Sequence, residues 1–275
     1  MRNTYIIDSS IDITAKEKYE LSIQLMLDGL SFSIKDTINN KIVALAEYQF
    51  SPITLTSMDN LDAEIRKLYE SEKLLQNKDY KKVDLVYITD KQSLIPEEFY
   101  DTNSLKTLFT AQNEITENEE LLSNYIKSEK AYLVFAFPGL ISHFLYKKFP
   151  QINIYHQSTI ILNNIVDNEN KSTLVAIKTR NKYTTFALKE NNRTILVNTY
   201  PTSKSEDILY YISAIADGFN LQNKEYELLM NIEKGEIAFD KLSQYVNVNT
   251  IEKDLSTKYH KKISSKERLR NYYIL

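Results

Sequence analysis

The chain has 275 residues, no cysteine, and 34 basic against 37 acidic residues, which gives a net charge of −3. This length predicts two modest domains, and the lack of cysteine excludes disulfide frameworks, thiolate nucleophiles and cysteine zinc sites and favours a cytoplasmic protein. The near-neutral charge excludes a global field that would attract nucleic acid or an anionic membrane.

The small number of glycines and the short apolar runs argue against further classes of protein. Only four residues are glycine, which argues against several glycine-rich phosphate loops, and the sequence contains neither a P-loop nor a Rossmann fingerprint. The longest apolar runs, such as residues 131–137, are far shorter than the roughly 20 residues of a membrane-spanning helix. We therefore expect no membrane span. Residues 1–16 lack the apolar centre of a secretory signal, so we expect no secretory start either.

The first half of the chain predicts a three-stranded antiparallel meander, a helix and a further strand. Apolar and polar residues alternate along the first two strands, which an Asp28-Gly29 turn connects, and Pro52 ends the third. The helix has apolar residues at helical spacing, and the last strand is a short apolar run typical of a buried strand. The strands are expected at residues 20–27, 30–34, 42–50 and 83–89, and the helix at 61–75.

A region that has no counterpart in the second half follows. Residues 100–130 predict two polar helices around an acidic stretch, which we interpret as an inserted surface element. A strand at 131–137, a helix that opens at Gly139 and a short strand at 152–155 come next. A helix at 156–168 is then expected to connect the two halves.

The second half repeats the order strand, strand, strand, helix, strand. Its third strand ends at Pro201, Ser205 caps the helix that follows, and a final helix passes through Phe239 and Leu242. The repeat predicts an internal duplication with little residue identity. The repeated strands are expected at 173–179, 183–189, 194–200 and 226–232, the first domain at 1–168 with its helical insertion at about 100–130, and the second domain at 169–275 with a basic C-terminal tail.

Several short motifs stand in a fixed order along residues 18–250. They are Leu21-Ser22-Ile23, Asp28-Gly29-Leu30-Ser31-Phe32-Ser33, Val134-Phe135-Ala136-Phe137-Pro138, Phe149-Pro150, His156-Gln157-Ser158 and Gly235-Glu236-Ile237. In this order and spacing the chain resembles a small bacterial family of unknown function with an actin-like ATPase fold. The resemblance implies an α/β protein with two ribonuclease H-like domains, each with a mixed sheet of a three-strand antiparallel meander plus parallel strands, and flanking helices. It implies no established activity.

The actin-like fold implies a nucleotide site made by three loops. In the turn between the first two strands, Asp28 would position magnesium or a water, Gly29 would allow the tight turn, and Ser31 would bond a phosphate oxygen. The usual loop has its glycine two residues after the aspartate, so an ordinary Asp-Gly hairpin is the alternative interpretation. The second loop, at 178–182, has neither an acidic residue nor a glycine, and the third offers Gly235 alone. We therefore expect no cofactor and no ATPase activity, with Mg-ATP binding as the alternative.

Two further sets of residues suggest chemistry. Asp28, Asp84 and Asp90 are candidates for the metal site of a ribonuclease H-type nuclease, but no other acidic residue of the first meander is expected to point the same way, so we expect no metal. His156 is either an acid or base at an inter-domain cleft, or a histidine that caps a helix or packs in the core.

The C-terminal tail and one tyrosine pair are candidate binding surfaces. The tail combines basic and aromatic residues, and we interpret it as a solvated terminal helix, with contact to RNA or anionic lipid as the alternative. Tyr210 and Tyr211 form an exposed pair that could anchor a partner. The tail residues concerned are Lys258, Tyr259, His260, Lys261, Lys262, Lys266, Arg268, Arg270, Tyr272 and Tyr273.

Two strand–helix units with unsupported nucleotide loops predict a non-catalytic actin-like protein. We expect a cytoplasmic scaffold or adaptor that binds another protein or its own copy. The alternatives are an ATP-binding enzyme of the actin and sugar kinase superfamily with atypical phosphate loops, and a nucleic-acid-associated factor that binds through the tail. Fold alone does not choose among these functions.

Overall fold

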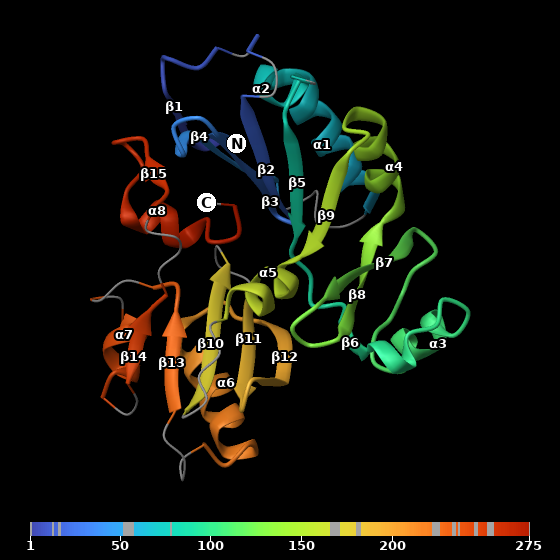
Figure 1. Cartoon of the computed structure of the whole chain (residues 1–275), viewed down its shortest axis with the longest axis vertical. Helices are drawn as coiled ribbons and strands as arrows, with labels where there is room; N and C mark the ends of the chain where they lie inside the picture. Colours follow the sequence, from blue (N-terminus) through green and yellow to red (C-terminus); the bar gives the residue numbers. More distant parts are fainter. Residues whose placement is uncertain are drawn as a thin grey trace.

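The strands of the protein form three sheets, which Figure 1 shows in a computed structural model. Two of the sheets lie one above the other along the long axis, and the third lies beside them. The structure describes residues 2–12, 14–15, 18–51, 58–77, 79–165, 171–179, 183–221, 226–232, 235, 237–244, 247–251 and 256–274.

The first sheet is built on the predicted meander. Its strands are β1 (Arg2–Ile7), β2 (Tyr19–Met26), β3 (Gly29–Asp36), β4 (Lys41–Gln49), β5 (Lys82–Tyr87), β9 (Ile152–His156) and β15 (Lys258–Tyr259). They stand in the order β1-β4-β3-β2-β5-β9, and β15 pairs with the start of β4. The meander β2-β3-β4 is antiparallel, whereas β5 pairs in parallel with both β2 and β9.

The second sheet repeats this arrangement. Its strands are β10 (Ser172–Thr179), β11 (Tyr183–Glu190), β12 (Arg193–Pro201), β13 (Tyr226–Met230) and β14 (Val248–Thr250). Their order, β12-β11-β10-β13-β14, corresponds strand by strand to β4-β3-β2-β5-β9, with the same antiparallel meander and the same parallel pairs. The predicted structural repeat is confirmed at the level of sheet order.

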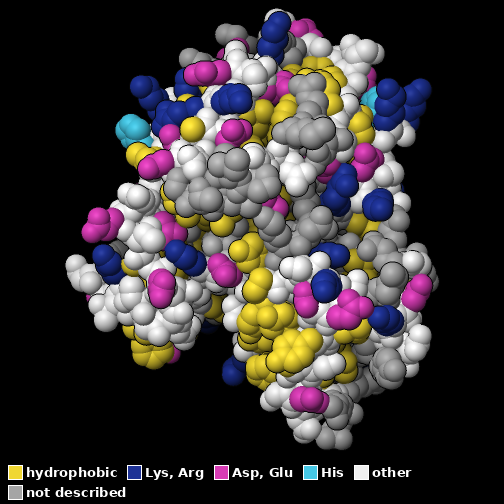
Figure 2. Space-filling model, turned by 180° about the vertical axis from the view of Figure 1, so that it is seen from behind, with side chains coloured by type: hydrophobic (Ala, Val, Ile, Leu, Met, Phe, Trp, Pro, Cys, Tyr) yellow, Lys and Arg dark blue, Asp and Glu magenta, His cyan; other side chains and the backbone are white. Residues whose placement is uncertain are grey.

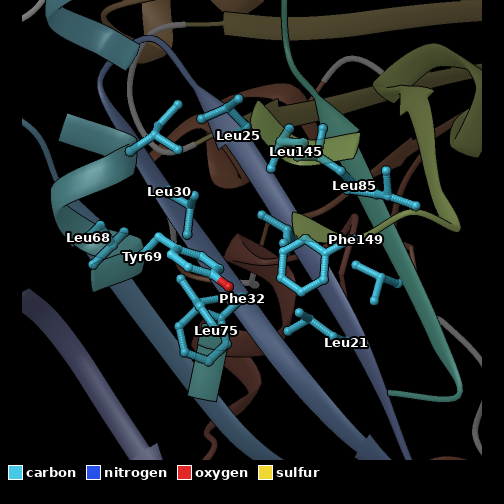
Figure 3. Packing of buried hydrophobic residues seen from close by; sticks show 14 of the residues in the cluster. Leu21, Leu25, Leu30, Phe32, Leu68, Tyr69, Leu75, Leu85, Leu145 and Phe149 are labelled. Atoms are coloured by element: carbon cyan, nitrogen blue, oxygen red, sulfur yellow. The ribbon is translucent and has the colours of Figure 1, made fainter. Parts of the chain in front are cut away.

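Helices cover the outer face of each of these sheets. On the first sheet the apolar sides of α1 (Met58–Ser71), α2 (Lys73–Gln76) and α4 (Gly139–Lys148) join alternate residues of β2 and β3 in one buried cluster, part of which Figure 3 shows. On the second sheet α6 (Ser205–Gly218) and α7 (Ile237–Leu242) form the corresponding cluster with β10 and β13. In β2 the predicted alternation holds, because Leu21, Ile23 and Leu25 belong to the outer cluster.

The region predicted as a helical insertion contains a strand. It holds one short helix, α3 (Leu105–Thr110), and β7 (Glu119–Ile126), which pairs with β8 (Ala131–Pro138); β6 (Gln92–Pro96) completes this third sheet. The prediction of two polar helices at 100–130 was therefore wrong for the second helix. Apolar residues at 121, 122, 125 and 126 imitate helical spacing, but pairing along all eight residues of β7 with β8 determines the conformation.

The helix expected to connect the two halves is α5 (Gln157–Asn164). Its apolar residues Ile161 and Leu162 pack in a cluster with Val86 of the first sheet and with Val175 and Ile177 of the second, so α5 lies against both sheets. The predicted division between residues 168 and 169 lies outside the described residues and stays a prediction.

The last part of the chain returns to the first sheet. This C-terminal segment, residues 256–274, contains β15 and α8 (Ser265–Arg270) and lies between the first and second sheets (Figure 1). α8 has no buried residue, as the interpretation of a solvated terminal helix predicts, but Tyr272, Tyr273 and Ile274, which follow it, are buried. The burial of these three residues could not be predicted from the sequence, because the many lysines and arginines that precede them indicate a solvent-exposed tail.

Candidate functional site

A row of polar side chains lies on the face of the first sheet that looks toward the second. This inner face consists of Gln24 of β2, Ser31 and Ser33 of β3 and Glu47 of β4, all of them buried. Ser31 is the direct neighbour of Gln24 on one side and of Glu47 on the other. They share a face because side chains alternate along each strand and Leu21, Ile23 and Leu25 occupy the opposite face.

The C-terminal segment covers this inner face. Arg270 binds Glu47 with both ends of its guanidinium, through Nε to Oε1 at 3.1 Å and Nη2 to Oε2 at 2.8 Å. Asn271 Nδ2 donates to Glu47 Oε1 at 2.7 Å, and Ser33 Oγ donates to the carbonyl of Ile274 at 2.5 Å. The carboxylate of Glu47 is 2% exposed, so it is held in a dry setting by charge-assisted hydrogen bonds.

The turn proposed as a first phosphate loop faces the second sheet. Leu27 and Asp28 connect β2 to β3, and Gly29 is the first residue of β3. Burial raises the pKa of Tyr183, at the start of β11, and the nearby carboxylates of Asp90 and Asp28 raise it further. The fold therefore brings Asp28 close to the hairpin that would carry the second loop, of which residues 180–182 lie outside the described residues.

The two other candidate nucleotide residues, Ser31 and Gly235, lie in different surroundings. Ser31 is fully buried, and its Oγ has no hydrogen-bond partner in the described part of the chain. Gly235 is exposed at φ +93°, and its N–H donates to Asp240 Oδ1 of α7 at 3.2 Å. Where a glycine pair was expected, the buried amide of Asn231 bonds the N–H and carbonyl of Lys178 at 2.7 and 2.8 Å and the carbonyl of Leu269 at 3.0 Å.

The carboxylates suggested for a nuclease do not form a metal site in the described residues. Asp84 pairs with Lys82 at 2.6 Å and accepts from Asn153 Nδ2 at 2.9 Å, so its oxygens are used within the sheet. Across the same described ranges, no three histidine, aspartate or glutamate side chains gather where they could hold a metal ion. These ranges also contain no helix long and apolar enough to cross a membrane.

His156 and Gln157 form a buried polar junction between the sheets. His156 caps α5, with Nδ1 accepting from the N–H of Ser158 at 3.2 Å and Nε2 lying 3.1 Å from the carbonyl of Thr89. Because Nδ1 accepts, Nε2 carries the proton and the ring is neutral. Gln157 Nε2 donates to the Thr89 carbonyl at 2.6 Å and to Thr199 Oγ1 of β12 at 2.9 Å, so one side chain ties the two sheets together. The prediction that His156 caps a helix or packs in the core is confirmed.

The buried, neutral His156 should make the free energy of unfolding depend on pH. Burial lowers the pKa of His156 from 6.5 to about 3, so between these values protonation occurs in the unfolded chain and favours unfolding. Its contribution to stability is complete above pH 6.5 and is lost as the pH falls toward 3, at about 1.4 kcal/mol per pH unit. We expect His156→Gln to flatten the pH dependence of the free energy of unfolding between about pH 6 and pH 4, measured by urea denaturation.

The matched control for this prediction is His143→Gln, which changes an exposed histidine and should keep the parental slope. A parental slope in His156→Gln would contradict a neutral His156.

Residues that sequence reasoning missed hold the site together. They are Glu47, Gln157 and Asn231, and Asn124, whose Oδ1 accepts from the N–H of His156 and from Thr159 Oγ1, each at 2.9 Å. Only Glu47 had a visible signal, since an acidic residue inside the apolar run 42–50 requires a buried partner.

Comparison with known proteins identifies the fold. The family model described as "Protein of unknown function (DUF3822)" matches residues 8–248. A Bacteroides thetaiotaomicron protein of actin-like ATPase fold and unknown function matches with 23% identity and a TM-score of 0.74, over 88% of this chain and 94% of that chain. A chain of the PilM-PilN type IV pilus biogenesis complex matches with 12% identity and a TM-score of 0.58, over 92% of this chain and 94% of that chain. The chain has the actin-like ATPase fold; a comparison with curated proteins gives no match.

Proposed function

The chain belongs to the DUF3822 family of proteins of unknown function, and on this premise we propose that it is a non-catalytic actin-like protein that binds a protein partner or a second copy of itself. The observation that carries the proposal is the C-terminal segment, which covers the inner face where Ser31 lies. The lack of cysteine supports a cytoplasmic location.

The surroundings of the proposed phosphate residues argue against nucleotide binding. A triphosphate needs several backbone N–H groups and side-chain donors at close range. Ser31 is fully buried, Gly29 is paired with Met26 within the sheet, and the N–H of Gly235 donates to Asp240 of α7. Among the described residues, the candidate site thus offers few of the donors that the nucleotide-binding members of this fold would need, and this supports a protein that has the fold without the ATPase.

Surface aromatic residues support a protein partner. Figure 2 shows hydrophobic side chains gathered on the lower half of the molecule, on the side of the second sheet. On β12 and α6, Tyr200 stacks on Tyr211 with ring centres 4.4 Å apart, and Tyr210 and Ile195 are 68% and 44% exposed. Exposed aromatic groups of this kind anchor protein partners. PilM, which has the same fold, is described in a complex with PilN.

Thermal unfolding in the presence of Mg-ATP tests the proposal. A ligand that binds only the folded protein raises the melting temperature, and at 100 times its Kd it adds about 2.7 kcal/mol. We expect the melting temperature with millimolar Mg-ATP to equal that with magnesium alone, because the candidate phosphate residues that the structure describes offer few donors for a triphosphate. A rise that disappears in Asp28→Ala would instead support the alternative, an ATP-binding enzyme with atypical loops.

A further inference from the structure

The C-terminal segment joins the first sheet as a bound peptide would. The second sheet ends with β14, and β15 then pairs in parallel with the first two residues of β4, beyond the point where the pairing of β1 with β4 ends. The N–H of Lys258 donates to the carbonyl of Asn40 at 2.9 Å, and that of His260 donates to the carbonyl of Ile42 at 3.0 Å. Adding a strand to an open sheet edge is a common way in which proteins recognise extended peptides.

Side chains of the inner face contact successive residues of the segment. Glu47 binds the cation of Arg270 and the amide of Asn271, and Ser33 donates to the carbonyl of Ile274. The side chain of Ile274 packs with Ile42 and Leu45 of β4 in a small apolar cluster. The face therefore selects a cation at one end of a five-residue stretch and an aliphatic residue at the other.

The aromatic residues in the middle of this stretch pack against both sheets. Tyr272 and Tyr273 belong to a buried cluster with Met26 and Val86 of the first sheet and with Val175, Ile177 and Ala187 of the second. Their rings meet edge to face, with centres 5.5 Å apart. Both sheets contribute to the pocket that holds the two tyrosine rings. Binding of a segment to the inner face therefore depends on how the two sheets are positioned relative to each other.

The segment leaves polar atoms of the inner face unsatisfied. Gln24 Oε1 and Ser31 Oγ, which are neighbours across β2 and β3, have no hydrogen-bond partner among the described residues, and the same holds for Asn271 Oδ1. Folded proteins pair nearly all buried polar atoms, and each exception requires an explanation. The inner face thus offers more hydrogen-bonding groups than the segment uses.

We propose that the inner face of the first sheet is a docking site for a peptide of a partner protein, with an arginine followed by aromatic and aliphatic residues, and that the C-terminal segment occupies this site as an internal substitute. The inference rests on the proposed protein-binding function and names the chemistry of the partner. Charge complementarity supports it, because the buried carboxylate of Glu47 requires a cation. A bound partner displaces the segment and adds bonds to Gln24 and Ser31.

The tethered segment lowers the apparent affinity of any competing peptide, because a tether keeps it at a high effective concentration. Holding the segment in place should therefore weaken binding of a peptide in trans. The chain has no cysteine, so an engineered pair forms the one possible disulfide. Lys41 and Lys258 are direct partners in the parallel pair of β4 and β15, at the Cα separation that a disulfide spans, and neither is buried.

The experiment measures binding of a fluorescent peptide with the sequence of residues 256–275 to the full-length Lys41→Cys/Lys258→Cys protein. The same molecule is compared in its oxidised, locked form and in its reduced form. We expect the reduced form to bind the probe at least ten times more tightly than the oxidised form. A probe with Arg270→Ala should bind the reduced form at least ten times more weakly, whereas a probe with Lys266→Ala, which changes an exposed lysine, should bind as the parent does.

A second variant strengthens the test without a disulfide. Full-length protein with Tyr273→Ala has a weakened segment and should bind the parental probe at least ten times more tightly than the unchanged protein. Its control, Tyr210→Ala, removes an exposed tyrosine elsewhere and should leave binding unchanged. Before binding is measured, circular dichroism is used to check that each variant is folded.

Several results would overturn the proposal. They are equal binding by the oxidised and reduced forms, equal binding of the parental and Arg270→Ala probes, or no binding by any folded form. A dimer that forms only when the pair is reduced, without probe binding, would assign the site to the segment of a second copy. An effect of ATP on the melting temperature would contradict the absence of nucleotide binding but not the docking site, so the two proposals can fail separately.

Discussion

Arg270→Ala should lower the free energy of unfolding by about 3 kcal/mol, because it leaves the carboxylate of Glu47 buried without its guanidinium partner. Removing one member of a buried ion pair costs roughly 3–5 kcal/mol, and the lower end applies here because water reaches Arg270, whose side chain is 36% exposed. Urea denaturation of the parent and the variant measures the difference.

Two further substitutions separate the charge from the packing of the segment. Glu47→Gln combined with Arg270→Ala removes the carboxylate as well, so the pair should lose less stability than the two single changes predict together. Lys266→Ala changes an exposed lysine of α8 and should stay within about 0.5 kcal/mol of the parent. If Arg270→Ala had as small an effect as Lys266→Ala, the contact between Arg270 and Glu47 would contribute nothing to stability.

Phe32→Ala should destabilise the protein by about 3–5 kcal/mol, the range observed when a buried phenylalanine is truncated. Phe32 is fully buried in the middle strand of the first meander, and its ring stacks on Tyr48 with centres 6.3 Å apart. Figure 3 shows it among leucines and aromatic side chains from the strands and the covering helices. The same buried cluster contains a small apolar cavity of about 20 Å³, lined by Leu25, Leu30 and other side chains but not by Phe32.

The control for this prediction keeps most of the lost volume. Phe32→Leu should lose under about 2 kcal/mol, because leucine refills much of the space. Phe99→Ala changes a phenylalanine that is 62% exposed and should have little effect. A loss as small for Phe32→Ala as for Phe99→Ala would mean that the core collapses around the missing ring.

Much of the fold could be predicted from the sequence because its strands have strong local patterns. Alternation in β2 and β3 and apolar runs in β4 and β5 place the meander and its parallel neighbour, and the same signals recur in β10 to β13. Strand β7 could not be predicted, because its conformation depends on pairing with β8 and its own residues fit a helix equally well.

The candidate site could be predicted only in outline. The sequence indicated a turn at Asp28 and a helix after His156, and both exist. The contacts that fill the space between the sheets join residues far apart in the chain, such as Arg270 with Glu47 and Gln157 with Thr199, and periodicity carries no information about such pairs. Whether Asp28, Gly29, Ser31 and Gly235 touch a nucleotide stays a prediction of the alternative function.

The position of the C-terminal segment also governs when the protein can finish folding. Arg270 and Ile274 contact residues that precede them by 223 and 241 positions. A ribosome that adds about 5–20 residues per second needs roughly 10–50 s to synthesise that stretch. During this time the acidic and polar inner face of the first sheet is uncovered, even if its strands have already paired. A nascent chain released before residues 256–274 are made would keep that face open, so covering of the inner face depends on a segment that is made long after β3 and β4.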